Sequence, residues 1–224
     1  MNLLNAQVSL ELALLGWALF LPAILLSLRQ VWRSFLPEGS QQHAWLAGLV
    51  VIAFLWTLQV KTGDGIAFGM LGAALYALLF GRARAILGLF AALVLHNALA
   101  DANWLNLGLN GLLFAVLPAL IAGALQRALE RWLPTNVFVF IIGNGMFVTL
   151  AATAVTGVAL LLLSMSTTAS AAAAFHLGDY VGITLMMAWG EAVVSGMIFS
   201  SLVIFRPSVV LTYSEDRYLP RRSR

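Results

Sequence analysis

The sequence predicts an all-α membrane protein, a polytopic bundle of about seven transmembrane helices with the N-terminus outside and the C-terminus in the cytoplasm. Of the 224 residues, 62% are hydrophobic and only 9% are charged, whereas a soluble domain carries about 25% charged residues. The apolar residues form runs of the length that a helix needs to cross a bilayer core of about 30 Å. The arginines gather in every second connection between these runs.

Seven apolar segments are expected to span the membrane as helices, because lipid offers no hydrogen-bond partners to an exposed backbone. They cover residues 8–28, 44–60, 66–81, 85–100, 111–126, 135–164 and 181–205. We interpret the long sixth segment as one tilted helix that is loosened around Gly143–Gly145. Two half-spans there would place the arginine-rich C-terminus outside, against the charge pattern.

The basic residues set the expected orientation. They follow the first, third, fifth and seventh segments, whereas the alternate connections hold only Lys61. The positive-inside rule then places the C-terminus in the cytoplasm. We therefore expect a single transmembrane domain over residues 1–205 and a basic cytoplasmic tail over 206–224. Dispersed arginines suit an anionic membrane surface better than nucleic acid, and the absence of cysteine excludes disulfides and thiolate metal sites.

Small residues recur every four positions in and beside the third segment, which predicts a row along one helix face. The row consists of Gly65, Gly69, Ala73, Ala77 and Gly81. Such rows let helix backbones approach closely in membranes. Two interpretations stay open: packing inside the bundle, or a docking seam for a partner membrane protein.

Polar groups gather toward the predicted outer side. His96, Asn97, Asp101 and Asn110 lie at or beyond the outer end of the fourth segment, and the α-amino group of Met1 lies on the same side. Glu191 lies deep in the last segment, and no Lys or Arg within the segments can pair with it. An ionisable group inside the membrane is a functional candidate. A carboxylate there is either protonated or faces a wet cavity that receives a cation or a proton.

Each of these groups also has a structural interpretation. In this interpretation, Asp101 ends a helix in the interfacial water and His96 is a hydrogen-bonded histidine of the core. Glu191 then has a purely structural role. Histidine, carboxylate and amide ligands suit borderline divalent ions such as Ni²⁺, Co²⁺ or Zn²⁺. However, no paired-ligand spacing such as HxxxH occurs, so any metal site has to be assembled by folding.

Two motifs carry a family resemblance. "GIAFGMLGAALYALLFG" (65–81), followed by a hydrophobic helix, an Asp and "LNLGLNG" (105–111), resembles the core of the CbiM/NikM-type permeases. These are the substrate-binding components of energy-coupling factor transporters for cobalt and nickel. The matching positions are Gly65, Leu71, Gly72, Ala74 and Leu75 in the first motif and Asp101, Gly108 and Asn110 in the second. The resemblance covers about residues 45–130, and it implies a fold of seven helices with an outside N-terminus.

The resemblance also implies metal ligands that this chain lacks. The family binds its metal through the terminal amine, a histidine at the second residue and the histidine of an "HLLGG" motif. This chain has Asn2 and Gly69 at those two places. The resemblance therefore implies the fold and a link to transport, and His96 is our own hypothesis for a replacement imidazole.

Together these features predict the substrate-capturing membrane component of a transporter in a bacterial cytoplasmic membrane. The expected substrate is a transition-metal ion such as Co²⁺ or Ni²⁺, or another small cation, and no permanent cofactor is expected. The chain has no P-loop motif, so it would need ATPase subunits and a coupling membrane subunit. The alternatives are an accessory or structural membrane protein, a secondary transporter with Glu191 as its proton site, and an intramembrane enzyme using His96 and Glu191. No nucleophile motif supports the enzyme.

Overall fold

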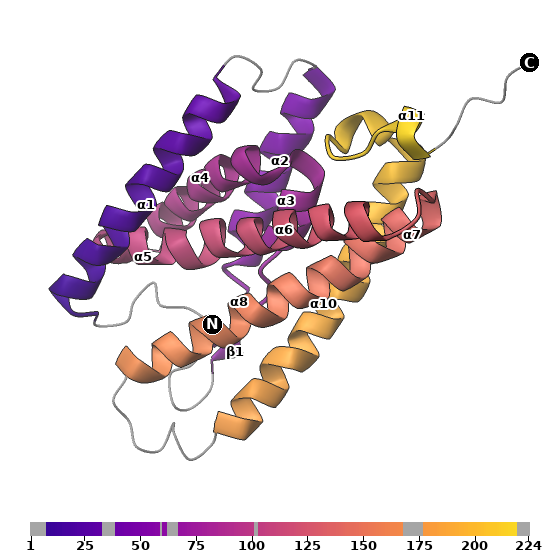
Figure 1. Cartoon of the computed structure of the whole chain (residues 1–224). Coiled ribbons are helices and arrows are strands. Elements are labelled where there is room, and N and C mark those ends of the chain that lie inside the picture. Colours follow the sequence, from indigo (N-terminus) through magenta and orange to yellow (C-terminus); the bar gives the residue numbers. More distant parts are fainter. Residues whose placement is uncertain are drawn as a thin grey trace, which may run out of the picture.

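The protein folds as a bundle of tilted helices, seen in the computed structural model of Figure 1. The structure describes residues 8–32, 39–58, 60–61, 67–100, 103–167 and 177–218. Its longer helices are α1 (Leu10–Val31), α2 (Gly39–Leu55), α4 (Arg82–Ala100), α6 (Leu117–Trp132), α8 (Thr149–Thr167) and α10 (Leu177–Phe205). Five helical stretches are long and apolar enough to cross a membrane: Leu10–Val31, Arg82–Leu99, Trp104–Trp132, Val137–Leu163 and Gly178–Phe205.

The predicted helical bundle is confirmed, and two of its expected spans are short. Helix α2 has 17 residues, and α3 (Ala73–Phe80) has only eight. A helix of eight residues is about 12 Å long at 1.5 Å per residue, so α3 cannot cross a bilayer alone. The expected span 66–81 is therefore wrong in its first half. That half contains the short strand β2 (Ala67–Phe68), which pairs antiparallel with β1 (Val60–Lys61).

Gly72 explains why α3 begins so late. Its φ of 65° lies in the left-handed region, which glycine enters without the steric cost that a Cβ brings. The chain therefore turns sharply at Gly72 and becomes helical only at Ala73. Gly81, with a φ of 78°, ends the helix in the same way.

The predicted row of small residues is not a helix face. Gly69 lies before α3, Gly81 lies after it, and Gly65 falls outside the described residues. Ala73 and Ala77 are in α3 and buried in the core, which fits the packing interpretation for these two residues. The expected close approach occurs elsewhere, between α1 and α5 (Leu107–Gly111). A Cβ added to Gly108 would lie 2.6 Å from the backbone nitrogen of Trp17.

The fifth and sixth spans each contain a π-helical turn. In the fifth, η1 (Trp104–Asn106) and α5 lead through the turn η2 (Leu112–Val116) into α6. In the sixth, α7 (Val137–Ile142) continues through the turn η3 (Gly143–Val148) into α8. This confirms one helix loosened around Gly143–Gly145. π-Helical turns are frequent near functional sites.

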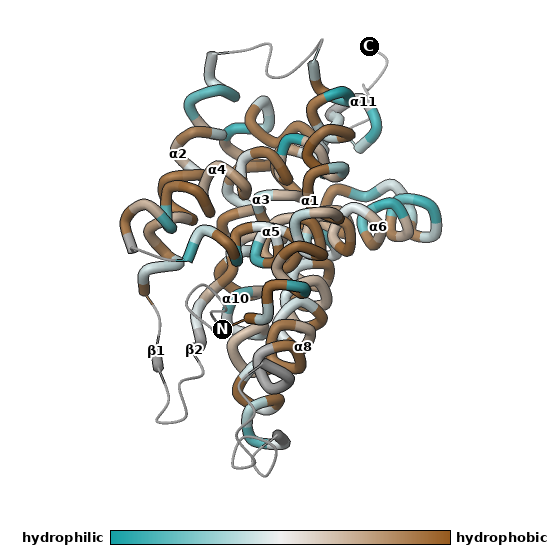
Figure 2. Tube along the Cα trace, turned by 90° about the vertical axis from the view of Figure 1, so that its left-hand side faces the viewer, coloured by the Kyte–Doolittle hydropathy of each residue, from teal (hydrophilic) through white to brown (hydrophobic). Residues whose placement is uncertain are grey.

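Helices α8 and α10 lie side by side in both views, and they extend away from the end of the bundle where α11 lies (Figures 1 and 2). Residues after α10 fold back over that end as η4 (Pro207–Val209) and α11 (Glu215–Tyr218). The backbone N–H of Leu211 donates to the carbonyl of Leu79 at 2.7 Å, and Arg217 pairs with Glu130 at 3.1 Å. The described part of the expected tail is thus attached to the helical domain.

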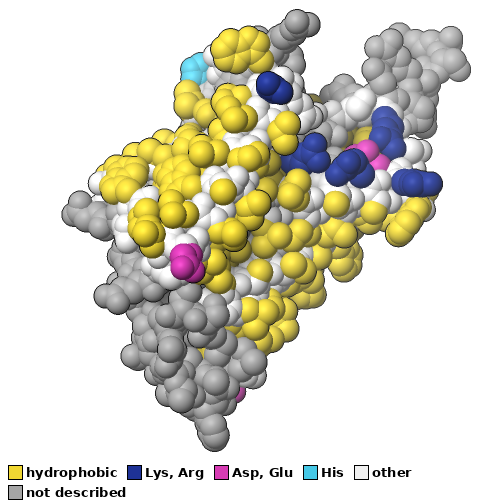
Figure 3. Space-filling model, turned by 60° about the vertical axis from the view of Figure 1, so that its left-hand side comes forward, with side chains coloured by type: hydrophobic (Ala, Val, Ile, Leu, Met, Phe, Trp, Pro, Cys, Tyr) yellow, Lys and Arg dark blue, Asp and Glu magenta, His cyan; other side chains and the backbone are white. Residues whose placement is uncertain are grey.

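The surface of the helical bundle is apolar, as expected of a protein surrounded by lipid. Large hydrophobic side chains are exposed along α1, including Leu14, Leu15 and Leu25, and yellow apolar atoms cover most of the face in Figure 3. The basic side chains on that face gather in its upper part, toward the end where α11 lies in Figure 1. An apolar belt with basic groups at one end is the pattern of a protein oriented by the positive-inside rule.

Candidate functional site

Three polar side chains predicted from the sequence are buried in the bundle. His96 and Asn97 lie in the last turns of α4, and Asn110 lies in α5; their exposed fractions are 2%, 0% and 0%. The backbone of Ala53 on α2 interacts with the imidazole. Even so, neither ring nitrogen, nor any side-chain nitrogen or oxygen of the two asparagines, makes a hydrogen bond of normal geometry within the described residues. Such unsatisfied groups are rare in native interiors and call for water, an ion or a ligand.

Aromatic rings connect these groups. The indole of Trp56 stands edge-on to the His96 imidazole, with ring centroids 6.3 Å apart and an interplanar angle of 88°. Its other neighbour is Phe114, at a centroid distance of 5.4 Å. Phe114 lies four residues after Asn110 and so on the same helix face. His96 thus contacts Trp56 directly, and Asn110 lies one helical turn from Phe114, which contacts the same indole. We call the buried side chains of His96, Asn97 and Asn110 the polar cluster.

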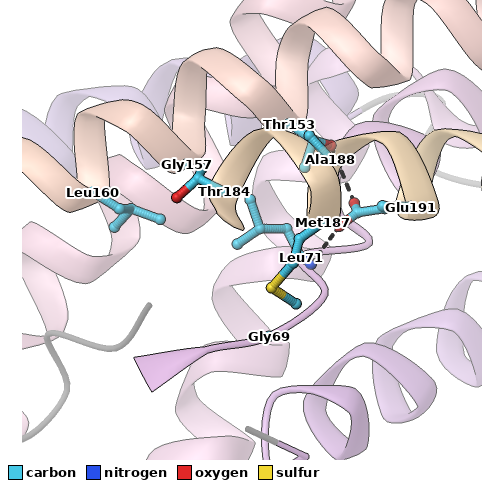
Figure 4. Close-up of a pocket in the computed structure, with 9 residues that line it drawn as sticks. All are labelled: Gly69, Leu71, Thr153, Gly157, Leu160, Thr184, Met187, Ala188 and Glu191. Atoms are coloured by element: carbon cyan, nitrogen blue, oxygen red, sulfur yellow. Dashed lines mark hydrogen bonds between the residues drawn. The ribbon is translucent and has the colours of Figure 1, made fainter. Parts of the chain in front are cut away.

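Glu191 lies at the midpoint of α10 and is buried. Its Oε2 accepts a hydrogen bond from the backbone N–H of Leu71 at 2.7 Å. Its Oε1 accepts from the backbone N–H of Gly72 at 2.8 Å and from the hydroxyl of Thr153 at 3.2 Å. Figure 4 shows the side chain reaching from α10 toward Leu71 and Thr153. Each oxygen thus accepts a hydrogen bond from a backbone N–H group of the segment 69–72.

The segment 69–72 is held from two sides. While its N–H groups bind Glu191, the carbonyl of Leu71 accepts a hydrogen bond from the indole Nε1 of Trp56 at 2.9 Å. Trp56 is itself buried. The segment thus links Glu191 on α10 with Trp56, the ring that contacts His96.

A small pocket lies on the Glu191 side of this segment (Figure 4). Gly69 and Leu71 form one wall, and α8 and α10 form the others through Thr153, Gly157, Leu160, Thr184, Met187, Ala188 and Glu191. The pocket holds about 330 Å³ of empty space, part of which is open to the surroundings. Glu191 is the only ionisable residue among the described residues that line the pocket.

Comparison with known families identifies the architecture. Residues 2–209 match the CbiM family, described as the cobalt uptake substrate-specific transmembrane region. The chain belongs to this family. The resemblance expected from the two sequence motifs is thereby confirmed, and the CbiM match extends far beyond residues 45–130.

Solved structures agree with this assignment at the level of the fold. A crystal structure of a transition metal transporter is similar, with a TM-score of 0.71 and 19% sequence identity over 95% of this chain and 96% of that one. A truncated transition metal transporter gives a TM-score of 0.69 and 18% identity over 91% and 99% of the two chains. Among curated proteins no match is found.

The structure brings together some of the residues that the sequence singled out in this CbiM member. Glu191 is connected to His96 through Leu71 and Trp56, and Trp56 also contacts Phe114, one helical turn after Asn110. Asn97 is buried beside His96 in the sequence of α4. Met1 and Asp101 lie outside the described residues. No group of three or more His, Cys, Asp or Glu side chains that suits a metal ion occurs among the residues with described positions.

Sequence reasoning missed Trp56, Thr153 and the backbone of Leu71. Leu71 lies in the first family motif, but the motif gives its backbone no role, and a lone tryptophan in an apolar run gives no periodic signal. The one available clue was Gly72, since a glycine before an apolar helix indicates a sharp turn. Such a turn leaves backbone groups that need partners inside a membrane.

Proposed function

We propose that this CbiM-family chain is the substrate-capturing membrane component of an energy-coupling factor transporter. Its substrate is a divalent transition-metal cation such as Co²⁺ or Ni²⁺, or another small cation. The observation that carries this proposal is the polar cluster. Its two buried amides make no hydrogen bond of normal geometry within the described residues, and its buried imidazole interacts only with the backbone of Ala53 and the ring of Trp56 among the contacts found there. The family match supports it, and so does the absence of Lys and Arg from the seven segments that the sequence predicts to span the membrane.

The cluster's chemistry fits such a substrate. A neutral imidazole and amide oxygens are ligands for borderline divalent ions. We assign His96 as a ligand and Asn97 or Asn110 as orienting groups, and we propose that Asp101 and the α-amino group of Met1 complete the set. Glu191 contributes negative charge from a distance, because three donors already occupy its two oxygens.

We propose that other subunits supply the energy for transport. The chain contains no P-loop motif for binding ATP. We propose that ATPase subunits and a coupling membrane subunit complete the transporter in a bacterial cytoplasmic membrane, with the N-terminus of this chain outside. The test is co-purification: an ATPase that stays bound in mild detergent supports the transporter, and a chain that purifies alone supports the accessory role.

The substrate is tested by thermal unfolding of the detergent-purified protein with a native N-terminus. Co²⁺, Ni²⁺, Zn²⁺ and Mn²⁺ are titrated separately. A ligand at about 100 times its Kd stabilises the folded state by about 2.7 kcal/mol, which shifts the unfolding midpoint measurably. We expect a saturable shift with one of these ions.

His43 supplies the matched control, because it is exposed at the start of α2, away from the polar cluster. His96→Ala is expected to abolish the shift, whereas His43→Ala is expected to keep it. No shift with any of the four ions would reject a transition-metal substrate. A shift lost equally in both variants would reject the polar cluster as the site.

A further inference from the structure

We propose that Glu191 is a positioning residue: its carboxylate fixes the segment 69–72, and through Leu71 and Trp56 it fixes the His96 side of the candidate site. The inference concerns how the fold holds this segment. Its consequence for substrate binding rests on the proposed function. Three structural features carry it: the use of both carboxylate oxygens, the conformation of Gly72, and the second anchor at Leu71.

Both oxygens of Glu191 are needed. Oε2 accepts from the N–H of Leu71 and Oε1 from the N–H of Gly72, at 2.7 and 2.8 Å. These distances lie at the short end of the range for N–H···O hydrogen bonds. An amide in place of the carboxylate would have one oxygen and one NH₂ group. The amide oxygen could accept from one of the two backbone N–H groups. The NH₂ group would face the other N–H, and two donors cannot form a hydrogen bond.

Glu191 holds the N–H groups at the start of α3 from another helix. Helix α3 has no side-chain N-cap hydrogen bond, and N–H groups at a helix start carry partial positive charge. Glu191 accepts from the N–H of Gly72, the residue that precedes the helix, and from that of Leu71 before it. The left-handed Gly72 packs closely on α2, since a Cβ built there would lie 3.3 Å from Cγ1 of Ile52. The turn is thus tightly placed, and its N–H groups point to α10.

The hydrogen bond between Trp56 and Leu71 couples the position of the Leu71 backbone to that of His96. The Leu71 carbonyl accepts from Nε1 of Trp56, and the indole ring stands edge-on to the imidazole. Because Trp56 is buried between His96 and Phe114, a shift of the Leu71 carbonyl either breaks this hydrogen bond or moves the indole. Glu191 therefore acts on the site through backbone atoms and one ring, without touching the substrate.

The natural lack of cysteine makes this inference directly testable. A cysteine placed by Met70→Cys reports on the segment itself, and Ser27→Cys reports on a buried position of α1. Helix α1 packs mainly on α4 and α5, away from Glu191. The rate of labelling by N-ethylmaleimide is measured for each reporter in detergent, in the Glu191 parent and in the Glu191→Gln variant.

The expected result is local. Glu191→Gln raises the labelling rate at position 70 about tenfold or more, where tenfold corresponds to about 1.4 kcal/mol, and leaves position 27 unchanged. Thr153→Val is the matched control, because it removes the third donor and keeps both backbone hydrogen bonds. It is expected to leave both rates near those of the parent.

Two results overturn the proposal. One is an unchanged rate at position 70 in Glu191→Gln. The other is an equal rise at positions 27 and 70, which would mean that Glu191 stabilises the whole bundle instead of positioning one segment. Neither reading needs a substrate, so a failure of the metal titration and a failure of this inference are distinguishable. If the metal binds, its affinity is expected to fall in Glu191→Gln and to hold in Thr153→Val.

Discussion

The indole of Trp56 stands edge-on to the imidazole of His96, with the two planes at 88° and the ring centroids 6.3 Å apart. The same indole donates its N–H to the Leu71 carbonyl. One buried side chain therefore joins the polar cluster to the turn before α3. Substitution of Trp56 therefore tests whether the polar cluster depends on the turn before α3.

Trp56→Phe removes the indole N–H and keeps an aromatic ring. The Leu71 carbonyl then loses its partner in a buried place, which costs about 1–3 kcal/mol of unfolding free energy. We expect a lower midpoint in thermal unfolding and a weaker metal-induced shift. Trp189→Phe is the control, because Trp189 is exposed on α10. Equal effects of the two substitutions would contradict a specific role for Trp56.

The crossing of α1 and α5 depends on glycine at position 108. A Cβ there would lie 2.6 Å from the backbone nitrogen of Trp17, so Gly108→Ala forces the two helices apart. We expect a loss of about 1–3 kcal/mol, as for other overpacked interiors, measured by unfolding in detergent. Gly190→Ala on α10 should be neutral or slightly stabilising, since no atom lies within 4 Å of that Cβ. A stable Gly108→Ala variant would contradict the tight crossing.

Alkaline pH should loosen the C-terminal segment through Tyr218. Burial, followed by the charge of Glu130, raises the pKa of Tyr218 above its ordinary value of 10.0, while Arg217 opposes the rise. A raised pKa means that the folded state favours the protonated phenol. This contribution to stability is complete below the unfolded pKa and is lost as pH rises through the higher folded pKa.

The difference between the parent and Tyr218→Phe isolates this effect. The tyrosinate absorbance is measured against pH for both proteins, and the difference between them gives the titration of Tyr218. The midpoint of that titration should lie above pH 10. Arg217→Gln should move it higher still, because the cation that lowers the pKa is gone. A Tyr218 that titrates at or below pH 10 would contradict its docking against α6 and α7.

The predicted orientation can be tested with single cysteines. Ser9 precedes α1 and Ser214 precedes α11, and both are exposed. In right-side-out membrane vesicles, an impermeant maleimide should label Ser9→Cys and should label Ser214→Cys only after the membrane is permeabilised. The reverse pattern would overturn the outside N-terminus that the arginine distribution predicts.

Long apolar periodic segments were the most predictable part of the fold. The helices over 10–31, 82–100, 104–132, 137–167 and 177–205 all lie on predicted spans, because length and hydropathy determine them. The third span was wrong in its first half, since the spacing of Gly69, Ala73 and Ala77 fits a helix equally well whether or not the chain turns at Gly72. The contact of Gly72 with Glu191, which accompanies the turn, leaves no local pattern in the sequence.

The candidate site was predictable in its residue types and not in its connections. His96, Asn97, Asn110 and Glu191 stand out because polar groups are costly inside a membrane. The sequence does not show that Glu191 binds backbone N–H groups 120 residues away, or that Trp56 lies between Leu71 and His96. Those contacts arise from helix packing, which leaves no local pattern.

The central claim is that a cation binds at the polar cluster, with His96 as a ligand. Cobalt K-edge X-ray absorption, recorded on dialysed protein loaded with Co²⁺, tests it most directly. We predict imidazole scattering in the parent protein and in His43→Ala, and its loss in His96→Ala. No retained cobalt, or the same imidazole scattering in His96→Ala as in the parent, would contradict the account.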